Sequence, residues 1–426
     1  GLDNIFGYTK SETLKQLKIN IPNKLLLIAE AFRKKISLQK IYKLSKVDPW
    51  FLNQIKEIVE EENKIIKKGL PKKYIEFNRL KSIGFSDKKL SKLTKIKENI
   101  VRSKRLALKV FPVFKKVDTC AAEFKSFTPY MYSTYQRNFS IKTECEANPT
   151  NKKKIIILGG GPNRIGQGIE FDYCCCQASF ALKEAGFETI MINCNPETVS
   201  TDYDTSDRLY FEPLIEEFVQ NIILKEKSKG DLLGVIAQLG GQTPIKLAKF
   251  LHENSLPILG TQYTSIDLAE DRDRFRNLLI KLNLKQAENG IAKTYGEAIK
   301  ISEKISLPLV VRPSYVLGGR AMEIVHDKSQ LKKFINEAFK ASEDNPILID
   351  KFIDNAMEVD VDAISDGKDV YVAGIMQHIE EAGIHSGDSA CCLPPISIKE
   401  HLLKELKIQT RKLALALKVK GFLNIG

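Results

Sequence analysis

The segment Lys154–Leu158, which is apolar from Ile155 onward, ends directly in the three glycines of residues 159–161. A short apolar run bounded by glycine is typical of a strand that is buried on both faces of a parallel sheet. Helical and strand patterns alternate after it, with a helix over 178–185, strands over 189–192, 234–239 and 257–259, and a helix over 243–253. This alternation predicts a doubly wound α/β domain over residues 151–266.

The residues on either side of this sheet follow different patterns. Residues 1–150 carry apolar stripes with helical spacing. Asp48 followed by Pro49 is a typical helix start, because Asp caps a helix and Pro tolerates its first turn. These patterns predict an all-α domain that serves packing or association. Residues 267–426 mix strands with long helices and predict an α+β domain.

Charge is unevenly distributed along the chain. Residues 1–150 hold 32 Lys and Arg against 15 Asp and Glu, within a total net charge of +13. The lysines are scattered over amphipathic helices and follow no aromatic stacking pattern, so we expect a solvated basic surface and no nucleic-acid partner. No apolar run approaches the roughly 20 residues needed to cross a bilayer, so no membrane association is expected.

Eight cysteines are present, including the consecutive runs Cys174–Cys176 and Cys391–Cys392. Adjacent cysteines make a poor disulfide framework, and no CxxC pair indicates a zinc site. We interpret these cysteines as reduced, small packing residues. Together with the lack of a signal-peptide pattern at the first residues, they predict a cytoplasmic protein.

The glycine-rich run Gly159–Gly168 lies between a predicted strand and a predicted helix, where glycines allow a ligand or another chain to approach the backbone. A dinucleotide site would require GxGxxG spacing and an acidic residue at the end of the second strand. That strand ends instead at Asn193 and Cys194, and the glycine spacing differs. No Gly-Lys-Ser/Thr follows the run, which also excludes a Walker A loop.

A second group of residues suits the binding of ATP. Arg272 and Arg312 can neutralise phosphate charge and hold a phosphate with two hydrogen bonds. The glycine loop at 318–320 can close over phosphates, and residues 350–353 can offer backbone groups and an apolar face to an adenine. Glu358 can accept hydrogen bonds from ribose hydroxyls. Taken together and in this order, these residues predict an ATP site.

A third run, Gly383–Ser389, combines small hydroxyl residues with His385 and Asp388, and His378 precedes it closely. Such residues suit contacts to phosphate, to ribose or to a small anion. A single histidine is more often structural, but two histidines this close together beside a carboxylate favour a binding role.

Several long runs resemble the carbamoyl phosphate synthetase large-chain family. The resemblance covers essentially the whole chain, including the helical part through residues 48–52 and 117–124. The runs are Gly159–Cys175 (GGGPNRIGQGIEFDYCC), Asn193–Asp207 (NCNPETVSTDYDTSD), Gly240–Pro244 (GGQTP), Arg312–Met322 (RPSYVLGGRAM) and His385–Ala390 (HSGDSA).

The resemblance implies a fold and an activity. The family's large chain joins two ATP-grasp halves through a helical oligomerisation domain, and its second half phosphorylates carbamate to carbamoyl phosphate, for pyrimidine and arginine biosynthesis. This chain is similar to the oligomerisation domain (1–150), a pre-ATP-grasp domain (151–266) and an incomplete ATP-grasp domain (267–426) that begins the second half. We therefore expect an ATP-grasp ligase.

The resemblance also implies roles for single residues. Arg272 and Arg312 would be catalytic, the phosphate loop would be Gly318, Gly319 and Arg320, and Glu170 and Glu197 would line an internal tunnel for carbamate. The implied ATP-binding residues are Arg272, Arg312, Lys351, Ile353, Glu358, Gly383, Ile384, His385 and Ser386.

The implied cofactors are ATP and Mg²⁺ or Mn²⁺, with K⁺ as a further candidate. The family continues after the last helix with Asn-(Val/Ile)-Gln-Phe-Ala, where the Gln, with a later Glu and Asn, binds magnesium. Here Asn424 and Ile425 are followed by Gly426. No metal ligand is thus expected within this chain, and we expect these residues alone to be inactive, because phosphoryl transfer relies on metal ions.

The resemblance further implies three partners: a glutamine amidotransferase small chain or fused domain, the N-terminal half of the same large chain, and a second copy bound through residues 1–150. Two alternatives stay open from the residues. The chain could be another ATP-grasp ligase of the biotin carboxylase type, or a non-catalytic module that acts in assembly through its helical part.

Overall fold

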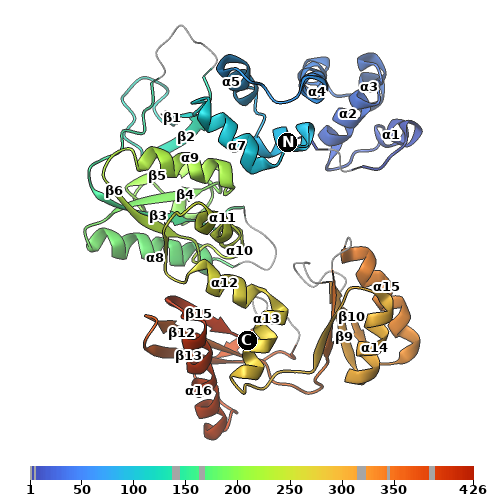
Figure 1. Cartoon of the computed structure of the whole chain (residues 1–426), viewed down its shortest axis with the longest axis vertical. Coiled ribbons are helices and arrows are strands. Elements are labelled where there is room, and N and C mark those ends of the chain that lie inside the picture. The colour runs from blue at the N-terminus through green and yellow to red at the C-terminus, as the bar shows by residue number, and fades with distance from the viewer. Residues whose placement is uncertain are drawn as a thin grey trace. The chain divides into compact units, whose positions relative to one another are not determined.

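The computed structural model describes residues 2–3, 6–136, 144–162, 168–313, 323–342, 346–382 and 389–426. The chain forms two compact units, and Figure 1 colours them by residue number. The first unit comprises Gly1–Pro149 together with Glu217–Lys225, and the second comprises Thr150–Glu216 and Glu226–Gly426.

Helices make up most of the first unit, as the apolar stripes predict. Their bounds are α1 (Lys10–Gln16), α2 (Lys24–Arg33), α3 (Leu38–Ser45), α4 (Pro49–Lys68), α5 (Tyr74–Ser82), α6 (Asp87–Thr94) and α7 (Glu98–Ala107). An antiparallel hairpin of β1 (Val113–Lys116) and β2 (Tyr130–Thr134) follows them. The sequence patterns did not predict this hairpin, so the unit is mostly helical and not purely so.

The predicted start of the long helix α4 is confirmed. The Asp48 carboxylate accepts a hydrogen bond from the backbone N–H of Trp50 at 2.8 Å, and Pro49 occupies the first helical position. The helix ends at Gly69, whose φ of 76° is one that glycine adopts without strain. Leu52, among other apolar residues of α4, packs against α2 in a core of the first unit.

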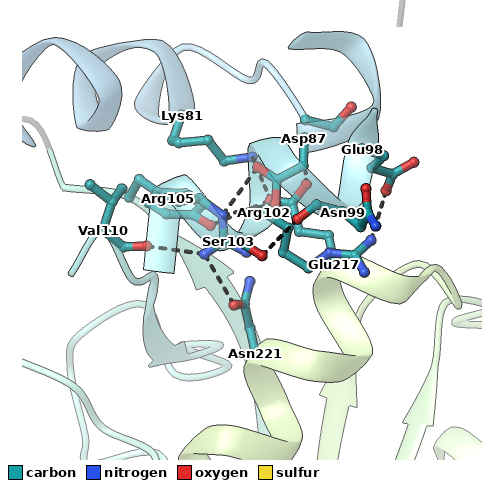
Figure 2. A network of polar contacts seen from close by, with 12 residues as sticks. Lys81, Asp87, Glu98, Asn99, Arg102, Ser103, Arg105, Val110, Glu217 and Asn221 are labelled. Carbon is teal, nitrogen blue, oxygen red and sulfur yellow. Dashed lines mark hydrogen bonds and ion pairs between the residues drawn. The ribbon is translucent and has the colours of Figure 1, made fainter. Parts of the chain in front are cut away.

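A second contribution to the first unit comes from α9 (Glu216–Glu226), which lies between two strands of the second unit in chain order. Figure 2 shows the buried charge network that holds it. Glu217 of α9 binds Lys81 of α5 and accepts a hydrogen bond from the backbone N–H of Asp87 at 2.7 Å. The Arg105 guanidinium of α7 binds both carboxylate oxygens of Asp87, at 2.9 and 3.1 Å. Four helices thus share one cluster of two cations and two anions.

The second unit begins with the predicted doubly wound sheet. Its strands within this unit are parallel and lie in the order β5-β4-β3-β6-β7. Numbered within this sheet, the order is 3-2-1-4-5, which is that of a dinucleotide-binding type of fold. The strands are β3 (Lys153–Leu158), β4 (Glu188–Asn193), β5 (Arg208–Phe211), β6 (Asp231–Ile236) and β7 (Ile258–Leu259).

The connections of this sheet are mostly helical. They are α8 (Glu170–Glu184), the one-turn 3₁₀ helix η1 (Val199–Thr201), α10 (Gln242–Ile245) and α11 (Ala248–Glu253). Helix α8 lies along one side of the sheet (Figure 1). It begins eight residues before the predicted start, because its first two turns carry polar residues and cysteines instead of an aliphatic stripe. Cys175 and Cys176 are buried there, and all eight cysteines are free.

The charged residue in the first buried strand has its own partners. Lys154 is fully buried, and its ammonium group lies 3.0 Å from the carboxylate of Glu226, which is buried as well. It also donates to the backbone carbonyls of Glu226 and Lys229, at 3.1 and 2.8 Å. A buried charge is tolerated when it is paired and hydrogen-bonded in this way.

Two antiparallel sheets follow in the described part of the second unit, in the orders β10-β9-β11-β8 and β14-β13-β12-β15. Their strands are β8 (Asn289–Ala292), β9 (Leu309–Pro313), β10 (Glu323–Val325), β11 (Ile347–Lys351), β12 (Val359–Ser365), β13 (Val370–His378), β14 (Cys391–Cys392) and β15 (Gly421–Ile425). The helices are α12 (Tyr263–Glu270), α13 (Arg272–Lys281), α14 (Tyr295–Ile305), α15 (Lys328–Ser342) and α16 (Glu400–Ala416).

Each of these two sheets has its own apolar core. Ile349 of β11 packs with Ala298 of α14 and Ile335 of α15 in the first. Leu413 of α16 packs with Phe275 of α13 in the second. This arrangement confirms the predicted α+β character of the last part of the chain. No helix among the described residues is long and apolar enough to span a membrane.

Candidate active site

Two of the predicted site residues, Arg272 and Arg312, line one cavity of about 250 Å³. Arg272 is the first residue of α13, and Arg312 lies in β9. We call this space the arginine cavity; its lining residues are Arg272, Asp273, Phe275, Arg276, Leu279, Gln286, Asn289, Ile291, Arg312, Leu348 and Asp350. The fold therefore brings together two cations that are 40 residues apart in the sequence.

Strand pairing fixes the position of Arg312. Strands β9 and β11 are antiparallel, with Arg312 opposite Leu348, so that Asp350 lies diagonally across from it. The Nε and Nη2 atoms of Arg312 lie 3.0 and 2.9 Å from Oδ2 of Asp350. The Arg312 side chain is still 40% exposed. Asp350 thus orients a guanidinium group that remains accessible to a ligand.

A third arginine, Arg276, lines the same cavity and was missed in the sequence. It follows Arg272 by four residues on α13, and residues at this spacing share one face of a helix. Its Nε is buried and has no hydrogen-bond partner among the described residues. Three arginines face two carboxylates, Asp273 and Asp350, around the cavity, so its lining carries an excess of positive charge that suits a phosphate-bearing ligand.

The other predicted ATP-binding residues that the structure describes do not line the arginine cavity. The Lys351 ammonium group donates to the backbone carbonyl of Leu307 at 2.7 Å and so points to a turn of the backbone. Ile353 is 57% exposed, and the carbonyl of Glu358 accepts a hydrogen bond from the His378 backbone N–H at 3.0 Å. Gly318, Gly319, Arg320, Gly383, Ile384, His385 and Ser386 lie outside the described residues.

A second cavity, also of about 250 Å³, lies at the carboxyl ends of β3 and β4. Open α/β sheets bind ligands at this edge. We call it the glycine-loop cavity; its lining residues are Gly160, Gly161, Gly168, Ile169, Phe171, Asp172, Asn193, Asn195, Glu197 and Thr198. The glycine-rich run and the predicted tunnel residue Glu197 therefore meet at one site.

Asn193 explains why the end of β4 is not acidic. Its amide oxygen accepts hydrogen bonds from the backbone N–H groups of Gly161, at 3.0 Å, and Cys194, at 2.8 Å. Its amide nitrogen donates to the hydroxyl of Ser200 at 3.0 Å. A Cβ atom on Gly159 would lie 2.6 Å from this amide, so glycine is required there. The oxygen of the Asn193 side chain thus holds the glycine-rich run, and its nitrogen holds η1.

The predicted tunnel residues occupy neighbouring positions. Glu170 is the first residue of α8, and its carboxylate folds back over Gly168, where a Cβ would lie 2.0 Å from Glu170 Oε2. The backbone N–H of Glu197 donates to the side chain of Asn195 at 3.0 Å, while Glu197 itself is exposed and lines the cavity. One glutamate thus lines the cavity, and the other lies against a glycine that does.

His378 belongs to the fold and not to either cavity. It is buried, and its Nε2 lies 2.8 Å from the Asp360 carboxylate on the neighbouring strand. No group of three or more His, Cys, Asp or Glu side chains in the described part of the chain is arranged to hold a metal ion.

Three family models match the chain. Residues 2–109 match the oligomerisation domain of the carbamoyl-phosphate synthetase large chain, and residues 151–268 match the carbamoyl phosphate synthase preATP-grasp domain. Residues 271–426 match the ATP binding domain of the carbamoyl-phosphate synthase L chain.

Curated relatives extend over nearly the whole chain. The carbamoyl phosphate synthase large chain of Pasteurella multocida is 56% identical over 405 residues, which cover 95% of this chain and 37% of that protein. The large chain of Neisseria meningitidis serogroup A is 54% identical over 418 residues, which cover 98% of this chain and 38% of that protein. The chain thus spans somewhat more than a third of the length of these relatives.

Solved structures resemble the chain more weakly. The biotin carboxylase domain of the 2-oxoglutarate carboxylase from Hydrogenobacter thermophilus has a TM-score of 0.49 and 20% identity, and the match covers 64% of this chain and 60% of that one.

The three family models and the two curated relatives agree with one another, so the chain belongs to the carbamoyl phosphate synthase large-chain family.

Proposed function

We propose that this chain forms part of a carbamoyl phosphate synthase and that its arginine cavity takes part in the ATP-dependent phosphorylation of carbamate. One observation carries the proposal: Arg272, Arg276 and Arg312 line a single cavity within the segment that matches the family's ATP binding domain. Because the chain spans 37% of a relative's length, the activity is that of the whole large chain, to which these residues contribute.

The reaction would be an in-line attack of a carbamate oxygen on the γ-phosphate of ATP, with ADP as the leaving group. Carbamate is already an anion, so no general base is needed. The requirement is stabilisation of the charge that spreads over the phosphate oxygens, which fixed cations supply. Arg272 and Arg312 would supply it, Arg276 would add to it, and Asp350 would hold Arg312 in its orientation.

Magnesium would bridge phosphate oxygens in such a reaction. Since the described residues form no metal site, we assign no metal ligand to this chain. Mn²⁺ and K⁺ stay candidates for the whole enzyme. Because the chain spans 37% of a relative's length, we expect no carbamoyl phosphate from residues 1–426 alone.

The sharpest test of the proposed function is a partial reaction. The complete large chain that contains this sequence should form ATP from ADP and carbamoyl phosphate, and residues 1–426 alone should not. ATP can be measured by coupling its formation to a reporter enzyme. A complete chain that fails to form ATP, or forward synthesis of carbamoyl phosphate by residues 1–426, would contradict the proposal.

We also propose that the glycine-loop cavity is part of a passage for carbamate. Glu197 lines it, and Glu170 lies against Gly168 in its wall. Replacing Glu197 with Lys puts a longer side chain of opposite charge into the wall. Glutamine-dependent synthesis should fall on the order of tenfold or more, which corresponds to about 1.4 kcal/mol, while the ATP partial reactions of both halves stay near normal.

The comparison of coupled synthesis with the partial reactions decides this prediction. Glu253→Lys, at the exposed end of α11, is the matched control, and it should leave every activity unchanged. If Glu197→Lys lowers the second partial reaction as much as synthesis, Glu197 maintains the fold or the ATP site, and the passage is wrong.

Further proposals concern the domain limits, self-association and partners. We propose domain limits of 1–150, 151–266 and 267–426, supported by matches to family models over 2–109, 151–268 and 271–426. Self-association through residues 1–150 is supported by the exposure of Trp50 and Phe51 at the start of α4. The N-terminal half and a glutamine amidotransferase are the further proposed partners, and the free cysteines suit a cytoplasmic enzyme.

A further inference from the structure

Asp172 of α8 lines the glycine-loop cavity and is only half satisfied by its surroundings. Its Oδ2 atom accepts a hydrogen bond from the backbone N–H of Ser200 at 2.9 Å, and the Cys176 thiol lies 4.0 Å from the same oxygen. Its Oδ1 atom is buried and has no hydrogen-bond partner in the part of the chain that the structure describes. One carboxylate oxygen thus holds η1, and the other has no donor among the described residues.

The surrounding structure holds Asp172 in place, so that its side chain cannot easily turn to bring Oδ1 to a donor. Farther along α8, the Ser179 hydroxyl donates to the Thr205 carbonyl at 2.7 Å and lies 3.1 Å from the Thr189 hydroxyl, and these contacts fix the rotation of the helix about its axis. Burial, with a contribution from Asp172, raises the pKa of the Cys176 thiol to about 12, so this residue stays a neutral thiol. A thiol is a weak donor, and it approaches the oxygen that is already paired.

A buried polar atom without a partner costs stability, so each one that persists requires an explanation. Structural groups are normally satisfied within the protein, whereas groups that meet a ligand are satisfied only when it is bound. Asp172 borders a cavity, which favours the second explanation over a defect in packing.

The described wall of the cavity selects the kind of ligand. Beside Asp172 it offers the Glu197 carboxylate, the amides of Asn193 and Asn195, and the Thr198 hydroxyl, and no described lining residue is Lys, Arg or His. The backbone N–H of Gly161 already donates to Asn193. The two carboxylates can only accept, whereas the Asn195 amide and the Thr198 hydroxyl can also donate, so a small molecule that carries an N–H group beside an acceptor group fits this wall.

We propose that Asp172 is a ligand-binding residue whose Oδ1 accepts a hydrogen bond from an N–H group of the small nitrogen compound that passes through the glycine-loop cavity. This assignment rests on the proposed function, under which that compound is carbamate. Ser200, held by Asn193, positions the carboxylate by binding its other oxygen.

The test is Asp172→Asn in the complete enzyme. The Ser200 N–H requires an oxygen, so the amide oxygen takes the place of Oδ2, and the amide nitrogen, a donor, takes the place of Oδ1. Synthesis from bicarbonate, ATP and glutamine should fall about 10- to 100-fold, the factor expected for losing a hydrogen bond to a charged group. ATP formation from ADP and carbamoyl phosphate should stay normal.

The melting temperature distinguishes a ligand-binding role of Asp172 from a structural one. If Asp172 stabilised the fold, Asp172→Asn would lower the melting temperature. The variant removes an unpaired carboxylate oxygen and keeps the Ser200 hydrogen bond, so the melting temperature should stay the same or rise. Glu184→Gln, at the exposed end of α8, is the matched control and should change neither activity nor melting temperature.

Two results would overturn the role of Asp172: normal synthesis by Asp172→Asn, or a lower melting temperature with parallel loss of both activities. An unmodified enzyme that makes no carbamoyl phosphate would instead overturn the proposed function. The two failures are therefore distinguishable in one set of assays.

Discussion

Replacing Arg312 with Met should lower ATP formation from ADP and carbamoyl phosphate by about 10²- to 10³-fold in the complete large chain, by analogy with the loss of one donor to a transition state. The physical reason is local. Arg312 is fixed by Asp350 in the arginine cavity, and methionine keeps much of the volume but neither the charge nor the hydrogen bonds. Arg272 and Arg276 remain, so the loss should be large but incomplete.

The other half of the enzyme provides the internal control for this variant. Bicarbonate-dependent ATP hydrolysis should largely survive, because its site is not among these residues. Arg411→Met, an exposed arginine of α16, is the matched control and should leave both activities unchanged. Equal loss of the two activities in Arg312→Met would mean that Arg312 does not belong to the second site.

The doubly wound sheet could be predicted because its strands have a strong local signal. Ile155–Leu158 are apolar, end in glycine and are all buried in β3, and β4 is buried along its whole length around the apolar residues Ile190–Ile192. The short strand β5 was missed, since its sequence, Arg208–Phe211, has only three non-charged residues in a row and lies between Asp207 and Glu212. Its burial depends on its parallel partner β4, which is a tertiary effect.

The association of α9 with the first unit could not be predicted. Sequence order places this helix between β5 and β6, where a crossover helix of the sheet is expected. What the sequence conceals is that Glu217 and Asn221 reach residues more than 100 positions earlier in the chain. A charged residue in an amphipathic helix is usually on the solvated face, and no local signal marks the exceptions.

Prediction of the candidate site was partial for a similar reason. Arg272 and Arg312 were expected to act together, and they line one cavity, although their roles stay a prediction. Arg276 was missed even though its spacing from Arg272 places both on one face of α13. The proposed acceptor role of Asp172 depends on the lack of a hydrogen-bond partner for its Oδ1 atom, and only the three-dimensional structure shows this.

The buried charge network of Figure 2 gives the second large effect. Glu217→Gln removes one of two negative charges from a cluster in which Lys81, Asp87, Arg105 and Glu217 are each at most 5% exposed. The cluster is then left with an uncompensated buried cation. Breaking a buried pair in this way costs about 3–5 kcal/mol, so the first unit should lose that much free energy of unfolding.

Tyr135 does not compensate for the lost charge. Its hydroxyl lies 3.4 Å from the Glu217 carboxylate, and burial raises the pKa of Tyr135 well above its ordinary value. The tyrosine therefore stays neutral, and it cannot supply the negative charge that Gln lacks at this position.

The single tryptophan makes the measurement specific. Trp50 lies in α4 of the first unit, so its fluorescence during urea unfolding follows this unit and not the second one. The urea concentration at the midpoint of unfolding should fall. The slope of the free energy of unfolding against urea concentration should not change, since the surface exposed on unfolding is the same. Glu57→Gln, an exposed glutamate on α4, is the control and should shift the free energy of unfolding by less than about 0.5 kcal/mol.

A double variant shows whether the loss of stability comes from an unbalanced buried charge or from the loss of a single contact. Lys81→Met with Glu217→Gln removes one cation and one anion, and it leaves Asp87 bound to Arg105 at 2.9 Å as a balanced pair. Residues in one network couple by about 0.5–3 kcal/mol, so the double variant should be more stable than the sum of the two single losses predicts. Strict additivity would show that Lys81 and Glu217 stabilise the unit independently. The cluster would then be a set of separate contacts, and charge balance would not be the reason that α9 is held.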